Sequence, residues 1–489
     1  MQQNTTAKNK TAEGFLGSVF KFSISTYINF IIYGITLLII GRFIPDVIYG
    51  PINAFISLST VVMNIAILGL DQSYIRFFHE PPADISTKSL FGACYFIACG
   101  CMALLALAGC LLFPVLLMQV MGLAFSFNYL PLLFLNAFFL MLSRFYNVAY
   151  RMEQNIPLFT LQSILSQFFS KLFYLVGFFF SSPKNAMLYA CVIGTAIFTL
   201  MFTFIRRRQI LPSKNAFSPP VIKDILPYGI ALAPAAVLIF ANSSFSTVYI
   251  GRILGEGSQG LFGFASSLSN IVTVIQGGFA TFWGAYVFAN YKTEQKRISS
   301  VHNYLNLLIL LFFTAIILFQ DVLFWLLPMY SDAKMIFPIM MLAPVFTILG
   351  EGTVYGISIA RKPIFDTLGI ALSFIANIIL SIVLIGRFSL MGAAAALALS
   401  SFVMFAFRTL VAQRFYRTVE NPVKTILALL MCNITACFGC IFANDFLLKA
   451  LVCCGSAAVY CFMYKKEVKR CFALGIGIIK SIPSMLKRK

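Results

Sequence analysis

Long apolar runs, separated by short clusters of charged residues, recur along all 489 residues of the chain. A helix needs roughly 20 mostly apolar residues to cross about 30 Å of hydrocarbon, and each run is about that long. The runs lack the alternation over about 10 residues that is typical of outer-membrane barrel strands. The pattern therefore predicts an all-α polytopic membrane protein with about 14 transmembrane helices. We expect these near residues 15–41, 47–70, 89–113, 123–150, 157–181, 185–205, 225–250, 258–284, 300–326, 335–360, 363–386, 389–413, 424–443 and 446–464.

The charged residues predict how these helices are oriented. Hydrophobic residues make up 60% of the chain and charged residues 11%, yet the net charge is +20. Lys and Arg are concentrated in alternate connections and in the C-terminal tail, which the positive-inside rule places in the cytoplasm together with both termini. We expect the excess charge to face anionic lipid, with no nucleic-acid partner. The opposite side carries only Arg42, Lys184, Arg252, Lys334, Arg387 and Lys449.

The residue types that carry metal or nucleophilic chemistry are not arranged for it. Most of the 12 cysteines lie inside predicted spans without metal-ligand spacing, so we expect free thiols that pack as small apolar side chains. Neither His79 nor His302 has a nucleophile or metal partner at useful spacing, and no phosphate-binding loop appears. We therefore expect no metal, no cofactor and no enzymatic activity.

One charged phrase occurs twice, 210 residues apart, where the first and seventh predicted spans end. The copies read IGRFIPDVIYG and IGRILGEGSQG. An arginine with an acid four residues later fits a local ion pair that caps a helix exit. The alternative interpretation is an outer gate that closes when two halves of the molecule tilt together. The residues concerned are Arg42, Asp46, Arg252 and Glu256.

A second match at the same offset, Arg151 with Arg361, lies at the opposite ends of the fourth and tenth spans. Two matches on opposite faces indicate duplication of a six-helix unit, with the copies related by an axis along the membrane normal. The polar, Pro-rich and basic stretch 206–224 is the expected linker. We therefore expect an N-terminal lobe (1–210), a C-terminal lobe (211–420), and two accessory helices with a basic cytoplasmic tail (421–489).

The fifth predicted span carries a charge, Lys171, near its middle. Such a charge costs at least about 2.5 to 3.5 kcal/mol in hydrocarbon, so it is expected to face a cavity or a partner. Gln167, Ser170 and Tyr174 recur with Lys171 at three- and four-residue steps, which places them on one side of a helix. One face of this span is therefore predicted to be wet or paired.

Polar residues mark other spans as well, including Asn29 on the first, Asn242 on the seventh and Asn270 on the eighth. Small polar side chains commonly join transmembrane helices, but stripes in corresponding helices of both halves favour a shared hydrophilic cavity. Arg144 either lines that cavity or snorkels to the interface. Glu351, inside the tenth span, either pairs with a cation or titrates as a coupling site. Cations outnumber acids on such faces, which indicates an anionic substrate such as a phosphate or pyrophosphate.

The stretch LGLDQSYIRFFHE, residues 68–80, resembles the corresponding stretch of bacterial polysaccharide repeat-unit flippases. These are the O-antigen and capsule translocases of the multidrug/oligosaccharidyl-lipid/polysaccharide exporter superfamily. Two further stretches are similar to that group: LPYGIALAPAAVLIFANSSFSTVYIGRILGEGSQGLFGFASSLSNI and MGAAAALALSSFVMFAFR. The resemblance covers nearly the whole chain.

This resemblance implies two six-helix lobes around a central cavity, and two accessory helices, in the bacterial cytoplasmic (inner) membrane. It implies alternating access that moves an undecaprenyl-pyrophosphate-linked oligosaccharide from the inner to the outer leaflet, for surface polysaccharides such as lipopolysaccharide or capsule. It also implies coupling to a proton or sodium gradient, and the role is compatible with a polysaccharide polymerase complex. The alternatives are an ion-coupled multidrug exporter or a lipid II flippase of the same fold, or an integral-membrane polymerase or ligase.

Overall fold

The structure is a computed structural model that describes residues 28–112, 129–210, 217–273, 276, 283–284, 286–288 and 290–470. The regular elements of these ranges are all helices. The middle of the expected linker (211–216) and the end of the basic tail (471–489) lie outside the described residues. The described cysteines, from Cys94 to Cys461, are free, as the sequence predicts.

Ten helices of the described ranges are long and apolar enough to span a membrane, which confirms a multi-pass membrane protein. Two of them, Pro219–Ser269 and Ile364–Phe415, are 51 and 52 residues long, and each covers two expected spans. The shorter apolar helix Ile28–Phe43 overlaps the second part of the first expected span (15–41), whose residues 15–27 lie outside the described residues. The fifth expected span is built from several short helical pieces instead of one continuous helix.

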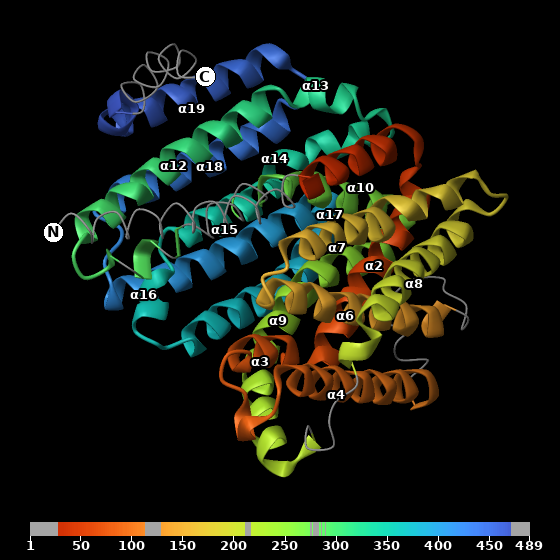
Figure 1. Cartoon of the computed structure of the whole chain (residues 1–489). Coiled ribbons are helices and arrows are strands. Elements are labelled where there is room, and N and C mark those ends of the chain that lie inside the picture. Colours follow the sequence, from red (N-terminus) through yellow and green to blue (C-terminus); the bar gives the residue numbers. More distant parts are fainter. Residues whose placement is uncertain are drawn as a thin grey trace, which may run out of the picture. The chain divides into compact units, whose positions relative to one another are not determined.

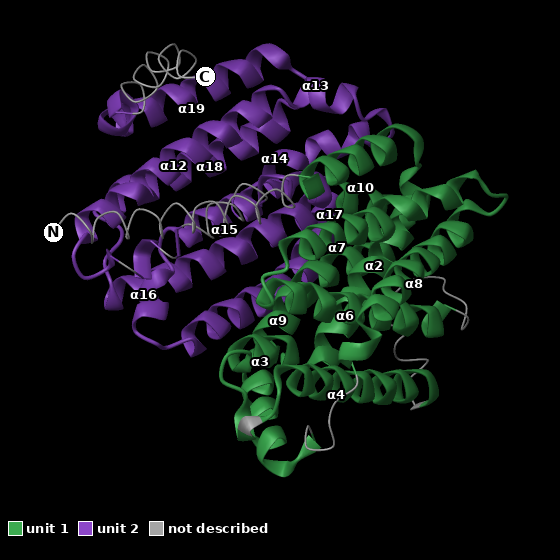
Figure 2. Cartoon of the chain, in the orientation of Figure 1, with its two compact units in different colours: residues 1–264 green, residues 265–489 purple. Residues whose placement is uncertain are grey.

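The chain forms two compact units, residues 1–264 and 265–489 (Figure 2). In the first unit α2 runs beside α9 and also packs on α4, α6 and α8 (Figure 1). Side chains in the middle of α2, such as Ile52 and Phe55, are completely buried. The helices of this unit are α2 (Asp46–Ile67), α3 (Leu70–Phe77), α4 (Thr87–Leu107), α6 (Tyr129–Met152), α7 (Ile156–Gln167), α8 (Pro183–Ile210), α9 (Pro219–Leu254) and the beginning of α10 (Glu256–Ser269). Shorter turns are η1 (Pro82–Asp84), η2 (Ala108–Leu112), η3 (Phe168–Leu172) and η4 (Phe173–Phe179).

The second unit is organised around three helix pairs: α12 with α19, α15 with α17, and α18 with α19. The two helices expected to be accessory, α18 and α19, therefore pack on each other and on the ninth span. The elements of this unit are α12 (Gln295–Leu318), α13 (Gln320–Trp325), η6 (Pro328–Met335), α14 (Phe337–Met340), α15 (Leu342–Glu351), α16 (Tyr355–Ile359), α17 (Ile364–Phe415), α18 (Pro422–Ile441) and α19 (Phe446–Met463).

The long helix α17 is two antiparallel arms joined by a reversal at Ser389. Ser389 has a positive φ of 49° with ψ −131°, which is not helical. Beyond it, a Cβ on Gly392 would lie 2.5 Å from the carbonyl carbon of Leu384, so only glycine permits this return of the chain. The hydroxyl of Ser373 on one arm donates to the carbonyl of Ser400 on the other at 2.8 Å. The arms match the expected spans at 363–386 and 389–413.

The same turn ends two helices in the two halves of the chain. Gln154 and Arg361 both have a left-handed backbone, with φ of 53° and 56°. The next residue in each case donates its N–H to a carbonyl five positions earlier, Asn155 to Tyr150 at 3.0 Å and Lys362 to Ile357 at 3.2 Å. This pattern is a Schellman cap. The two caps are 207 residues apart, three fewer than the 210-residue offset of the sequence repeat, and they end the fourth and tenth expected spans.

Candidate functional site

The helix that carries Lys171 changes its winding at that residue. After α7 the chain forms a π-turn over η3 and then a 3-10 stretch over η4. Such π-turns frequently occur at functional sites. Lys171 is half-buried, and among the described residues it has no hydrogen-bond or ion-pair partner; its charge interacts only with the nearby thiol of Cys191 on α8. An ammonium group in the middle of an apolar segment is thus without a counter-ion in the part of the chain that the structure describes.

Other polar residues of this face hold helices together. Gln162, which is 1% exposed, donates to the carbonyl of Ser143 at 3.0 Å and accepts from the amide of Asn147 at 2.7 Å. Asn29 donates to the hydroxyl of Ser163 at 2.7 Å. Among the described residues, the polar side chains near Gln162 thus have hydrogen-bond partners, whereas Lys171 has none.

The remaining predicted cavity residues of the first unit lie in varied surroundings. Ser170 donates to the carbonyl of Ser166, one turn earlier in the same helix, at 2.5 Å. Tyr174 is only 3% exposed, and Asn242 is half-buried on α9. Gln167 is half-buried at the end of α7 and, among the described residues, has no hydrogen-bond partner. In the first unit, Gln167 and Lys171 are therefore predicted cavity residues whose polar groups have no partner among the described residues.

Arg144 forms an ion pair with Asp71 of α3. Its Nε and Nη2 atoms both contact the Oδ2 atom of Asp71, at 2.8 and 2.7 Å. The carboxylate of Asp71 is 3% exposed, whereas the side chain of Arg144 is 38% exposed. Gln72 donates to the same oxygen at 2.9 Å. A buried acid thus fixes a partly exposed guanidinium, and this acid belongs to the stretch LGLDQSYIRFFHE.

A second arginine, Arg206 at the end of α8, is almost completely buried. It makes a bidentate pair with Glu153, with N–O distances of 3.0 and 2.6 Å. Its guanidinium also lies over the rings of Phe91 and Tyr150, 5.0 and 4.9 Å from their centroids. Planar stacking and a bidentate carboxylate are the contacts that Arg, and not Lys, provides. Arg206 therefore ties α4, α6 and α8 together, and the sequence did not single it out.

The two copies of the repeated phrase meet at one end of α2. A Cβ on Gly50 would lie 2.8 Å from the backbone nitrogen of Gly260, and a Cβ on Gly260 would lie 2.6 Å from the carbonyl carbon of Asp46. Real Cβ atoms essentially never come this close, so the first turns of α2 and α10 touch only because both positions are glycine. Small residues at a crossing let two membrane helices approach closely. We call this contact the first glycine contact.

The charged residues of the first copy, as far as the structure describes their surroundings, do not form the local pair that their spacing allows. Among the described residues, exposed Arg42 makes no ion pair with Asp46, whose carboxylate accepts the N–H of Val47 at 2.8 Å. Glu256 instead pairs with Lys184 at the beginning of α8. Arg252 is exposed at the end of α9. The acid of the second copy therefore binds another helix of the same unit.

The opposite end of α2 makes a second close approach to α9. Leu68 and Gly69 both have a left-handed backbone, which breaks the chain between α2 and α3. A Cβ on Gly69 would lie 3.0 Å from the carbonyl carbon of Gly229, and one on Gly229 would lie 2.7 Å from the carbonyl oxygen of Leu68. The hydroxyl of Ser73 donates to the carbonyl of Ile225 at 2.7 Å. We call this the second glycine contact; α2 is thus fastened to the following helices at both ends.

In the second unit, Glu351 lies at the end of α15 and accepts a hydrogen bond from Gln276 at 2.9 Å. No described cation pairs with it. Arg408 pairs with Asp366 at 2.5 Å. Asn270 is exposed directly after α10. Among the described residues, no group of His, Cys, Asp or Glu side chains is arranged to hold a metal ion.

The family model "Polysaccharide biosynthesis protein" matches residues 15–288, more than half of the chain. The chain belongs to this family. Among curated proteins no significant match is found. The matched region includes the resembling stretch at residues 68–80, both copies of the repeated phrase, and Lys171.

Solved structures show the same fold at low sequence identity. "Lipid II flippase MurJ, inward closed conformation" superposes with a TM-score of 0.68 at 14% identity, covering 91% of this chain and 99% of that one. An inward-facing multidrug resistance MATE family transporter of the MOP superfamily gives a TM-score of 0.60 at 14% identity, covering 78% and 94%. The family protein described here therefore has the flippase-type transporter fold of the MOP exporter superfamily, as the resemblance implied.

Proposed function

We propose that this protein is a flippase that moves an undecaprenyl-pyrophosphate-linked oligosaccharide repeat unit from the inner to the outer leaflet of the bacterial cytoplasmic membrane. The observation that carries the proposal is Lys171, an ammonium group in an apolar segment of a polysaccharide biosynthesis family protein that has no counter-ion among the described residues. A charge in that position is expected to serve a polar pathway. The pyrophosphate supplies the opposite charge, and Gln167, one turn earlier, supplies an amide donor.

Arg144 is proposed as a second cation for the same anion. Its pairing with buried Asp71 uses the Nε and Nη2 atoms, and more than a third of its side chain stays exposed. Asp71 therefore orients the guanidinium and reduces its net charge without enclosing it. Tyr174, Ser170, Asn29, Asn242 and Asn270 complete the proposed cavity set.

Alternating access is proposed to work through the two glycine contacts. The first contact, where Asp46 packs on Gly260 and Lys184 pairs with Glu256, would separate α2 from α10 at one end of α2 when it opens. The second contact, where Gly69 packs on Gly229, would separate α2 from α9 at the opposite end of α2 when it opens. Arg42, Asp46, Arg252 and Glu256 then belong to the gate at the first end, which faces outward when both termini are cytoplasmic. Glu351, without a described cation partner, is the proposed proton or sodium coupling site.

The cargo is tested by deleting the gene and measuring where lipid-linked repeat units accumulate. We expect them on the inner leaflet, with loss of surface polysaccharide and restoration by the wild-type gene. A multidrug exporter would leave that distribution unchanged and alter drug sensitivity instead. A lipid II flippase would arrest peptidoglycan synthesis. A polysaccharide polymerase is the protein partner that the flippase role suggests, and co-purification tests it.

A further inference from the structure

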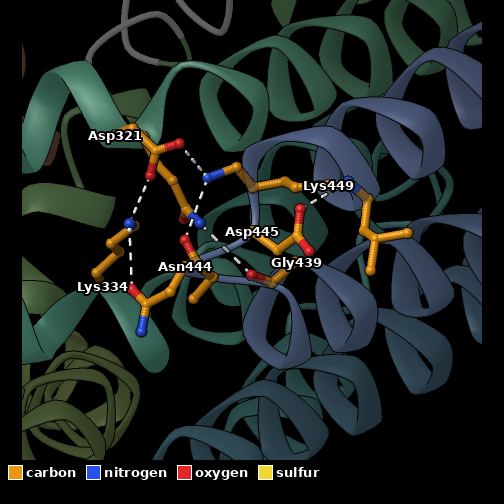
Figure 3. Close-up of polar contacts among 9 residues, drawn as sticks. Asp321, Lys334, Gly439, Asn444, Asp445 and Lys449 are labelled. Carbon is orange, nitrogen blue, oxygen red and sulfur yellow. Dashed lines mark hydrogen bonds and ion pairs between the residues drawn. The ribbon is translucent and has the colours of Figure 1, made fainter.

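An ion cluster that the sequence did not single out joins three elements of the second unit and the turn before the last of them. Asp321 of α13 binds two lysines, with its Oδ1 atom 2.5 Å from Lys334 of η6 and its Oδ2 atom 2.6 Å from Lys449 of α19 (Figure 3). Lys334 also donates to the amide oxygen of Asn444 at 3.3 Å. Lys449 is 0% exposed and donates to the carbonyl of Ala443 at 3.3 Å. Asp321 therefore bridges two lysines, the largely buried Lys334 and the fully buried Lys449.

A cavity of about 280 Å³ opens beside this cluster. It is lined by Asp321, Lys334, Asn444, Ser331, Asp332 and the indole of Trp325, together with two apolar side chains. Trp325 is 77% exposed. The lining residues 321–335 belong to the segment that connects α12 with α14, and Asn444 belongs to the turn between α18 and α19.

The chemistry of the wall excludes a strongly charged ligand. The lining carries two carboxylates, Asp321 and Asp332, and one ammonium group, Lys334, and the buried ammonium of Lys449, which pairs with Asp321 behind the wall, offsets the second carboxylate. What remains is a set of fixed hydrogen-bonding groups: a hydroxyl, a carboxylate, an amide NH2 and the free N–H of Lys334. An exposed indole beside them offers a flat apolar surface with a polar edge. A ring with hydroxyl groups at its edge and C–H groups on its face matches such a wall.

We propose that this cavity binds a neutral sugar ring of a saccharide. Its volume is near the lower limit of about 300 Å³ for small-molecule pockets, which suits one ring instead of a whole repeat unit. The sugar stacks on Trp325, and Asp332, Ser331 and Asn444 bind its hydroxyl groups. Asp321 and Lys449 are positioning residues, because they hold Lys334 and the α18–α19 turn in place. The inference rests on the proposed function, which supplies an oligosaccharide at the outward-facing end of the protein.

The chain offers a direct optical test because it contains only two tryptophans, Trp283 and Trp325. In a Trp283→Phe background the emission reports on Trp325 alone. The probe is the set of oligosaccharides released from the surface polysaccharide of the cells that make this protein. We expect a saturable change in emission with a Kd of roughly 1 mM, as a single-ring contact allows. Asp332→Asn and Ser331→Ala should each weaken it at least about tenfold.

The matched control is Glu420→Gln, which removes an exposed carboxylate from the connection at the other end of α18 and should leave the titration unchanged. Emission that does not respond to the saccharides, or responds equally in Asp332→Asn, overturns the inference and leaves Trp325 as a membrane-interface anchor. The deletion phenotype is read separately. If deletion traps lipid-linked repeat units on the inner leaflet while the emission of Trp325 does not change with saccharide, only this inference fails. If deletion traps no repeat units there, the proposed function fails.

Discussion

Gly50 and Gly260, which are 210 residues apart in the sequence, lie against each other so closely that neither position accepts a side chain. The contact is reciprocal, because a Cβ on Gly50 would strike the backbone of Glu256 and a Cβ on Gly260 would strike that of Asp46. The repeated phrase thus brings equivalent residues together across an approximate two-fold relationship. Its glycines make the contact, and its arginines stay at the exposed edge.

Substituting Gly260 by Ala is expected to favour the state in which the first glycine contact is open. Overpacking of this kind costs about 1 to 3 kcal/mol, which shifts a two-state equilibrium by roughly 5- to 150-fold. Labelling of a reporter cysteine at Ser258, in a cysteine-free chain, should accelerate accordingly. Gly100→Ala is the control, since a Cβ there meets nothing within 4 Å. Equal labelling in Gly260→Ala and the parent would exclude this contact as a gate.

Substituting Gly69 by Ala should act at the other end of the same helix. The residue has a φ of 67°, so alanine adds backbone strain of about 1 to 2 kcal/mol to the clash with Gly229. Gly229→Ala should have the same effect through the clash alone. We expect faster labelling of a cysteine at Gln72 and no acceleration at Ser258. Acceleration at Ser258 as well would show that the two ends are not separate gates.

The Arg144–Asp71 pair should respond unequally to removal of its two members. Arg144→Gln leaves a carboxylate that is 3% exposed without its cation, and breaking a buried pair in this way costs about 3 to 5 kcal/mol. Asp71→Asn leaves a guanidinium that is 38% exposed and that water can solvate, so its effect on stability should be smaller. Thermal unfolding of the purified variants in detergent measures the order. A larger loss for Asp71→Asn would contradict the burial argument.

Asp321 makes the second unit sensitive to acid. Burial alone would raise the pKa of this carboxyl group, but hydrogen bonds and charge from Lys334 and Lys449 outweigh it and lower the pKa below the usual 3.8. The pair therefore contributes stability that is fully present above the unfolded value and is lost as the pH falls through the lowered pKa. Asp321→Asn, which strands the fully buried Lys449, should cost about 3 to 5 kcal/mol at pH 7.

The difference in unfolding temperature between wild type and Asp321→Asn should shrink as the pH falls below about 4. Lys334→Met, which removes one of the two cations, should shift that decline to higher pH. A difference that stays constant from pH 7 to pH 3 would show that the ionised carboxylate does not stabilise the fold.

Local patterns predicted the spans, because hydropathy and helix length are properties of consecutive residues. The sequence predicted 363–386 and 389–413 as two spans. In the structure only the non-helical Ser389 interrupts the helical backbone between them. The partners of charged residues were not predictable in this way. Asp71 and Arg144 are 73 residues apart, and Asp321 and Lys449 are 128 apart, so only tertiary packing shows which acid meets which cation.

In the candidate site, too, local patterns were predictable from the sequence and tertiary contacts were not. Periodicity placed Gln167, Ser170 and Lys171 on one side of a helix, but it assumed an uninterrupted α-helix, and the π-turn at Phe168–Leu172 breaks that periodicity. The glycine contacts were visible only as a repeated phrase. Nothing in the sequence distinguished residues whose polar groups are occupied, such as Ser170, from Lys171, which has no ion-pair partner among the described residues.

The proposed role of Lys171 is tested most directly by the leaflet distribution of lipid-linked repeat units. The distribution is measured in cells whose only copy of the gene encodes the Lys171→Gln variant. A charge-assisted hydrogen bond contributes about 1.5 to 3 kcal/mol, so transfer to the outer leaflet should slow by roughly 10- to 150-fold, while Lys171→Arg keeps most of the rate. Protein amounts in the membrane are measured in parallel. Transfer by Lys171→Gln at the wild-type rate would contradict the claim that this cation receives the anionic cargo.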